Sequence, residues 1–159
     1  MSLLENFPLW AALFAVLFAQ FIKVPIQYIA TRKLDWSLMT STGGMPSSHS
    51  AMVTALATGV AVDTGLGSPV FAVATVFAIV TMYDASGVRR QAGKHATVLN
   101  QLVFEFKKLV SEVKSLPQKP EEEVRKELKE LLGHEPSEVF FGGLTGILLT
   151  LALHFLFRV

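Results

Sequence analysis

The hydrophobic residues of this chain gather into four long apolar stretches separated by polar segments. The stretches cover residues 7–22, 50–66, 70–83 and 139–157. An α-helix needs about 20 residues to cross a bilayer, so the last stretch is long enough, and the first becomes so by running on into the segment after it. The two middle stretches are shorter and would use flanking polar residues or a locally thinned membrane. The pattern therefore predicts an all-α integral membrane bundle with about four spanning helices.

The first apolar stretch is predicted to be a retained spanning helix and not a signal peptide. It lacks a basic start and a clear small-residue cleavage site, and it continues through Lys23. Lys23 falls near the end of this span, where a lysine reaches the membrane surface or faces the interior of the bundle.

A charged region precedes the last apolar stretch. Between residues 94 and 132, Lys, Arg and Glu alternate with apolar residues at helical spacing, and residues 117–120 (PQKP) interrupt the pattern. We expect two amphipathic helices here, the first starting at about residue 96. The predicted organisation is one membrane-embedded domain over residues 1–159, with a charged helical insertion at about 94–132.

The composition agrees with a membrane protein and excludes several kinds of chemistry. Hydrophobic residues make up 51% of the 159 residues, and the mean hydropathy is +0.46, which is too apolar for an ordinary soluble domain. The absence of cysteine excludes disulfides, thiolate metal sites and cysteine nucleophiles. With a net charge of only +1, the sequence does not indicate nucleic-acid binding.

Four alternating spans would bring most of the charged and titratable residues of interest to one side of the membrane, here called the motif face. Its members are Lys23, Arg32, His49, Asp84, Arg89, Arg90, His134 and Glu138. The same topology places every one of the 14 Lys and Arg residues except Arg158 on the motif face. By the positive-inside rule this face is predicted to be cytoplasmic, in an integral protein of the cell membrane.

The segment GGMPSSHSA, residues 43–51, combines a turn, small hydroxyl residues and a histidine at the start of an apolar stretch. Glycines allow backbone N–H groups to approach an anion, and a helix that starts near Ser47 or Ser48 adds its positive dipole end. His49 has the chemistry to protonate a leaving oxygen near neutral pH. The alternative is a serine-capped helix with a histidine at the membrane surface.

A second histidine motif, GHEPSEV, stands before the last span. Pro136 is suited to open a helix, and Glu138 follows His134 by four residues, a spacing at which a carboxylate can orient an imidazole. Taken with PSSH and an arginine pair, the motif resembles the type 2 phosphatidic acid phosphatase superfamily, which includes bacterial acid phosphatases and vanadium haloperoxidases. It resembles most the small divergent membrane branch of that superfamily.

The resemblance is carried by three motifs in order. Pro46, Ser47 and His49 match the middle Pro-Ser-Gly-His motif, with Ser48 in place of glycine. The last motif, Ser-Arg, five residues, His, three residues, Asp, is split into GVRRQAG (residues 87–93) and GHEPSEV, with Glu138 in place of aspartate.

The first superfamily motif, a lysine followed after six residues by Arg-Pro, is the weakest match. Eight residues separate Lys23 from Arg32, and a lysine follows where proline belongs. An alternative alignment of the last motif uses His95, which five residues separate from Arg89, the first arginine of the pair. It places Leu99 where the carboxylate belongs, so we favour His134.

The resemblance implies metal-independent hydrolysis, without a cofactor, of a lipid phosphate or an isoprenoid (di)phosphate through a phosphohistidine. His134 would be the nucleophile, Glu138 its orienting carboxylate and His49 the proton donor. The implied phosphate ligands are Arg89, Arg90, Lys23, Arg32, Ser47 and Ser48, and the implied supporting residues are Asp84, Lys94 and His95. Two alternatives remain open: a non-catalytic protein that binds or transports lipid phosphates, and, more distantly, a haloperoxidase. The expected partners are the membrane and the lipid phosphate substrate, and association of the chain into a homo-oligomer also stays open.

Overall fold

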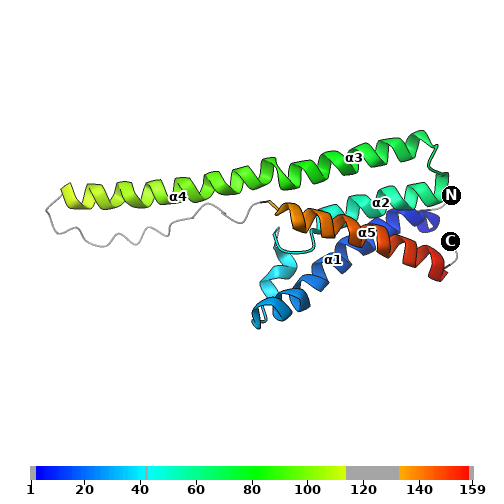
Figure 1. Cartoon of the computed structure of the whole chain (residues 1–159), viewed down its shortest axis with the longest axis horizontal. Helices are drawn as coiled ribbons and strands as arrows, with labels where there is room; N and C mark the ends of the chain where they lie inside the picture. The colour runs from blue at the N-terminus through cyan, green and yellow to red at the C-terminus, as the bar shows by residue number, and fades with distance from the viewer. Residues whose placement is uncertain (1–2, 42, 114–132, 158–159) are drawn as a thin grey trace.

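The computed structural model describes residues 3–41, 43–113 and 133–157 and is all-helical over these ranges (Figure 1). This confirms the predicted all-α fold class. The helices, in chain order, are η1 (Leu3–Glu5), α1 (Phe7–Thr31), η2 (Trp36–Thr40), α2 (Ser48–Thr64), α3 (Pro69–Ser86), α4 (Val88–Val113) and α5 (Pro136–Phe157).

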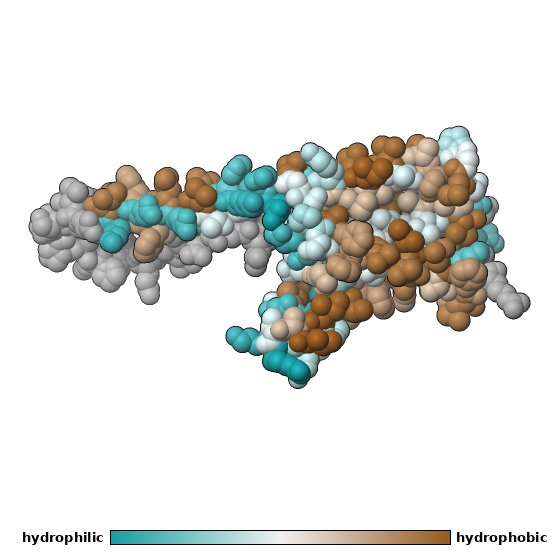
Figure 2. Space-filling view, in the orientation of Figure 1, coloured by the Kyte–Doolittle hydropathy of each residue, from teal (hydrophilic) through white to brown (hydrophobic). Residues whose placement is uncertain are grey.

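Three segments of the described chain are long and apolar enough to cross a membrane. They are α1, the run Pro69–Val110 that begins with α3, and α5. Helix α2 has 17 residues and packs among them, so the predicted count of about four spans is approximate. Figure 2 shows hydrophobic residues over most of the visible face of the bundle, and hydrophilic residues where α3 meets α4.

The helices alternate in direction as the pattern of stretches predicts. In Figure 1, the end of α1, the start of α2, the end of α3 and the start of α5 lie at one end of the bundle, here called the motif end. The opposite end, here called the far end, holds the start of α1, the turn between α2 and α3, and the end of α5. The two histidine motifs are therefore at the same end.

Two predicted boundaries differ from the structure. The segment expected to be a loop between residues 31 and 48 contains the short helix η2, which Asp35 caps through a bond from the Ser37 amide to its side chain. The first amphipathic helix begins at Val88 and not near residue 96. The non-helical backbone of Gly87 (φ −102°, ψ −88°) ends α3, and α4 begins at the next residue. The arginine pair is thus the first turn of α4. The second amphipathic helix predicted near residues 120–132 lies outside the described residues.

Small residues let α2 sit in the centre of the bundle. Ala15 and Ala19 of α1 pack against Ala51 and Ala55 of α2, and a second cluster joins α2 to α3 through Val53, Ala57, Val60, Ala74 and Ala78. On the α5 side, a methyl group at Gly142 would collide with the backbone of Ser47. Such close approach fixes the start of α5 against the start of α2, which is where the histidine motifs lie.

Candidate active site

His134 is held at the motif end by the backbone on both sides of it. Its amide donates to the carbonyl of Ala85 at the end of α3 (3.0 Å). Gly133, before it, has φ +93° and packs so tightly on the backbone of Arg89 and Arg90 that any side chain there would clash. A left-handed turn with no room for a Cβ requires glycine. The result is a histidine that is only 3% exposed.

Glu138 fixes the orientation of the His134 ring. The Nδ1 atom lies 2.9 Å from Glu138 Oε2, and the amide of Glu135 donates to the same oxygen (3.2 Å). Because an ionised carboxylate only accepts hydrogen bonds, Nδ1 is assigned as the donor, which leaves the lone pair on Nε2. Nε2 is buried and has no hydrogen-bond partner among the described residues. The ring is therefore oriented with a free basic nitrogen.

His49 lies opposite His134. It is the second residue of α2, and the two ring centroids are 6.1 Å apart with an edge-to-face arrangement. The charged side chains near enough to act on His49 include those of Arg89, Lys23 and Asp84. The predicted pair of histidines from two distant motifs is thus brought together in space.

A pocket of about 220 Å³ opens beside His134. Its lining combines backbone of two glycine-containing segments with charged side chains of α4 and α5. The lining residues are Gly43, Gly44, Arg90, Gly93, Lys94, Thr97, Gly133, His134, Glu135 and Glu138. The volume suits a phosphate-sized group. Of the two cations in the lining, Arg90 is one that the sequence assigned to phosphate binding, and Lys94 is one that it assigned a supporting role.

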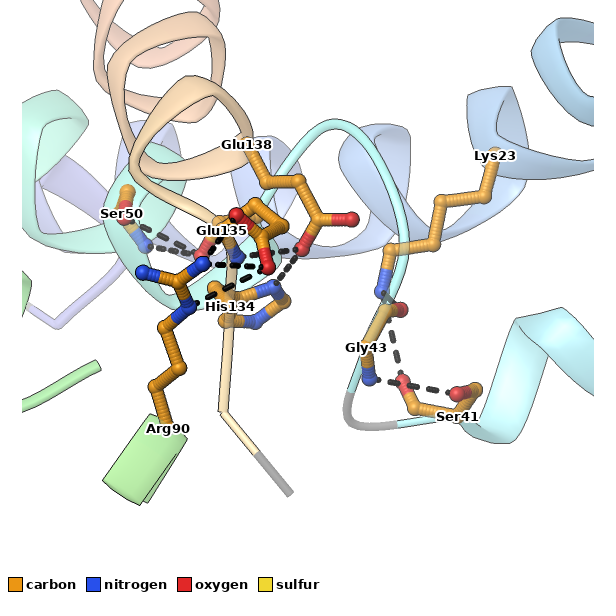
Figure 3. A network of polar contacts seen from close by, with 9 residues as sticks. Lys23, Ser41, Gly43, Ser50, Arg90, His134, Glu135 and Glu138 are labelled. Carbon is orange, nitrogen blue, oxygen red and sulfur yellow. Dashed lines mark hydrogen bonds and ion pairs between the residues drawn. The ribbon is translucent and has the colours of Figure 1, made fainter. Parts of the chain in front are cut away.

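The two arginines of the pair make different contacts. Arg90 forms a bidentate ion pair with Glu135, with Nη2 at 2.7 and 2.8 Å from the two carboxylate oxygens. Arg89 Nε lies 2.6 Å from Asp84 Oδ2 and does not line the pocket. Figure 3 shows the side chains of Arg90, Glu135, His134 and Glu138 turned toward one another.

Lys23 is buried, with 1% of its surface exposed, and its ammonium group holds the loop before α2. Nζ donates to the carbonyls of Gly43 (3.0 Å) and Ser41 (3.3 Å), as Figure 3 shows. Its charge also acts on Glu138. In this structure Lys23 positions the wall of the pocket, and it is not among the residues that line it.

The remaining predicted site residues lie around the pocket or away from it. Ser47 caps α2, accepts a bond from the Ser50 amide and donates its own amide to the Glu138 carbonyl (3.0 Å). Ser48 is buried in the first turn of α2. Arg32 is an exposed left-handed cap at the end of α1, and His95 is exposed on α4; neither lines the pocket.

Sequence reasoning missed two residues that shape the site. Glu135 was adjacent to the predicted nucleophile, but its bond to Arg90 joins residues 45 positions apart and leaves no local pattern. Gly133 carried a readable sign, since a glycine directly before a functional histidine often marks a left-handed turn or a close backbone contact.

The fold and the oriented histidine define an all-helical membrane protein with a polar site at one end of its bundle. The chain belongs to the Divergent PAP2 family, whose model matches residues 4–149. It is 65% identical over 157 residues to the "Uncharacterized membrane protein YuiD" of Bacillus subtilis (strain 168), covering 99% of each chain. No solved structure matches the chain. Membership indicates a phosphatase-related function, and the resemblance inferred from the motifs is confirmed at the level of the family.

Proposed function

We propose that this protein hydrolyses the phosphate ester or diphosphate of a membrane lipid through a phosphohistidine. The observation that carries the proposal is the burial and the hydrogen bonding of the His134 ring. The ring is buried, Glu138 holds Nδ1, and the free Nε2 lies in a site shared with His49 and bordered by a pocket that contains Arg90 and Lys94. An imidazole that only filled space would not need an orienting carboxylate on one nitrogen and an unused lone pair on the other.

The proposed reaction has two steps that share the same residues. Nε2 of His134 attacks phosphorus, the bond from phosphorus to the leaving oxygen breaks, and His49 gives that oxygen a proton. Glu138 stabilises the positive charge that develops on the imidazole. Water then attacks the phosphohistidine, His49 accepts its proton, and the N–P bond breaks to release phosphate and restore the lone pair. Arg90 and Lys94 would stabilise the charge on the equatorial oxygens, as phosphoryl transfer requires.

A lipid substrate is supported by an apolar cavity of about 510 Å³ between α2, α3 and α5. Thr54 and Met82 line it and also adjoin Gly143 of α5, one residue from the contact between Gly142 and Ser47. A hydrocarbon chain that entered this cavity would extend away from the pocket beside His134. The size and the apolar lining of the cavity suit a hydrocarbon chain of a membrane lipid phosphate.

The direct test is phosphate release by the purified full chain in detergent. Phosphatidic acid and an isoprenoid diphosphate should be hydrolysed, vanadate should compete with them, and a chelator should leave the rate unchanged. Release from neither substrate class, or a strict need for a divalent ion, would contradict the proposal. We also propose that residues 1–159 form one phosphatase-like domain, with the charged insertion at about 94–132.

A second candidate function is binding or transport of a lipid phosphate without turnover. It is favoured by the ion pairs Arg90–Glu135 and Arg89–Asp84, which neutralise both arginines of the pair. A bound substrate that is recovered intact, with saturable affinity and no released phosphate, would favour this function over hydrolysis.

We also propose that the motif end faces the cytoplasm in the cell membrane, since the basic residues concentrate there. The chain has no cysteine, so single cysteines can report the topology. Gln101 is exposed on α4, and Gly67 lies in the turn between α2 and α3, so the variants Gln101→Cys and Gly67→Cys report on the two sides. An impermeant thiol reagent on intact cells should label Gly67→Cys and not Gln101→Cys. The reverse pattern would place the site outside.

A further inference from the structure

The Arg90–Glu135 ion pair uses the edge of the arginine that is best suited to bind a phosphate. Nε and Nη2 of Arg90 both donate to Glu135, and both carboxylate oxygens accept. This side-by-side geometry is also how arginine binds two oxygens of a phosphate group. Both partners line the pocket beside His134. A phosphate that used this edge of Arg90 would have to displace the carboxylate.

We propose that Glu135 competes with the substrate phosphate for Arg90 and thereby lowers the affinity of the site for anions that bind this edge of the arginine. The inference rests on the proposed function and adds to it a residue that sets substrate affinity. Glu135 acts by contact with Arg90, and it has no part in the transfer of the phosphoryl group.

The backbone keeps Glu135 beside Arg90. The Gly133 turn packs on the backbone of Arg90, the His134 amide is bonded to Ala85, and the Glu135 amide is bonded to Glu138. Residues 133–135 therefore follow the first turn of α4 closely. The carboxylate stays near the pocket whether or not it is bonded to the guanidinium.

The Arg90–Glu135 ion pair is exposed enough for a phosphate to displace the carboxylate. The Arg90 and Glu135 side chains are 34% and 57% exposed, and exposed ion pairs contribute little to stability. A monoester dianion replaces the single charge of the carboxylate with two charges and can form the same two-point contact. A diester monoanion must displace the same carboxylate, so the ion pair lowers the affinity of the site for both kinds of anion.

The test is calorimetric binding of two probes to the full chain in detergent at pH 8. Inorganic phosphate is mostly dianionic there, because this pH lies above its second pKa, and dimethyl phosphate is a monoanion. Glu135→Gln should bind phosphate about two- to fivefold more tightly than the wild type, a range set by the weakness of exposed ion pairs. The affinity for dimethyl phosphate should rise by a similar factor, because both anions must displace the same carboxylate. Glu105→Gln, which removes the same charge from an exposed position on α4, should change neither affinity.

Coupling to Arg90 separates competition from a general change in charge. In an Arg90→Gln background, Glu135→Gln should give no gain in affinity, because the guanidinium for which Glu135 and phosphate compete is absent. If Glu135→Gln loses its cooperative thermal transition, Glu135→Asp serves instead, since it keeps the charge but is too short for the two-point contact. It should move both affinities in the same direction by a smaller factor.

The outcomes distinguish this inference from the proposed function. Wild-type binding of phosphate with no gain in Glu135→Gln, or a gain that persists without Arg90, overturns the role of Glu135 and leaves the phosphate site standing. If neither the wild type nor any variant binds phosphate, the proposed function fails together with the inference.

Discussion

The two ends of the bundle each hold a histidine with one unpartnered ring nitrogen, and their surroundings differ. At the motif end, Nε2 of His134 is buried without a partner while Glu138 holds Nδ1. At the far end, Nδ1 of His154 is buried without a partner, and its ring contacts Phe7 and Phe155 at centroid distances of 6.1 and 5.7 Å. No carboxylate orients His154 in the described chain.

The comparison shows that a free buried nitrogen does not by itself make a candidate site. The motif end adds an orienting carboxylate, a second histidine and a pocket with Arg90 and Lys94, whereas the far end offers aromatic packing. Coulombic stabilisation of a phosphoryl group needs fixed positive charge within a few ångströms. Only the motif end supplies such charge beside its histidine among the described residues.

The largest expected effect comes from removing either histidine at the motif end. His134→Ala removes the nucleophile and His49→Ala the proton donor, so each should lower phosphate release from phosphatidic acid by at least about 10³-fold. His154→Ala at the far end and His95→Ala on α4 should each keep most of the activity. An inactive His95→Ala beside an active His134→Ala would instead favour the unsplit alignment of the last motif.

The next expected effect comes from the carboxylate that distinguishes the two ends. Glu138→Gln keeps the shape of the side chain but removes the negative charge that orients Nδ1 and stabilises the imidazolium. Phosphate release should fall by about 10²-fold, which is less than for His134→Ala, because orienting residues cost less than nucleophiles. Glu105→Gln is the matched control and should retain the wild-type rate. Full activity of Glu138→Gln would mean that the orienting carboxylate does not distinguish the motif end from the far end in function.

A smaller effect is expected from the cation of the pocket. Arg90→Gln should raise KM about 10-fold or more, as loss of a charged hydrogen bond to phosphate predicts, with a smaller change in kcat. Arg32→Gln, also on the motif face but exposed and away from the pocket, should leave KM near the wild-type value. Steady-state kinetics of the two variants measure both constants. Equal effects would mean that general positive charge, and not the pocket, attracts the substrate.

The helices could be predicted from the sequence because each apolar stretch is long compared with a helical turn. Boundaries were less accurate where one residue decides them. The start of α4 at Val88 depends on the backbone break at Gly87, and the charge pattern from residue 94 onward contains no sign of it. Helix η2 was missed because five residues (Trp36–Thr40) are too few to show a periodicity.

The site was predicted in part because its histidines stand in local motifs with readable spacing. The spacing of His134 and Glu138 predicts their contact, since residues four apart share a helix face or turn. The contacts that complete the site join distant segments: Lys23 to Ser41 and Gly43, and Arg90 to Glu135. These depend on how α1 and α4 pack, which a single sequence does not reveal. The functional roles of all these residues remain predictions.

The smallest expected effect tests whether helix packing at the motif end serves the site. A Cβ at Gly142 would collide with the Ser47 backbone, and one at Gly59 would lie 2.8 Å from Cα of Pro8 near the far end. Both Gly142→Ala and Gly59→Ala should lower stability by about 1–3 kcal/mol, as overpacking does, measured by thermal unfolding in detergent. Only Gly142→Ala should also lower turnover, by about three- to tenfold, because it moves α5 with Glu138 away from His49. Equal loss of turnover in both variants would mean that activity follows overall stability and that the two ends of the bundle are not functionally distinct.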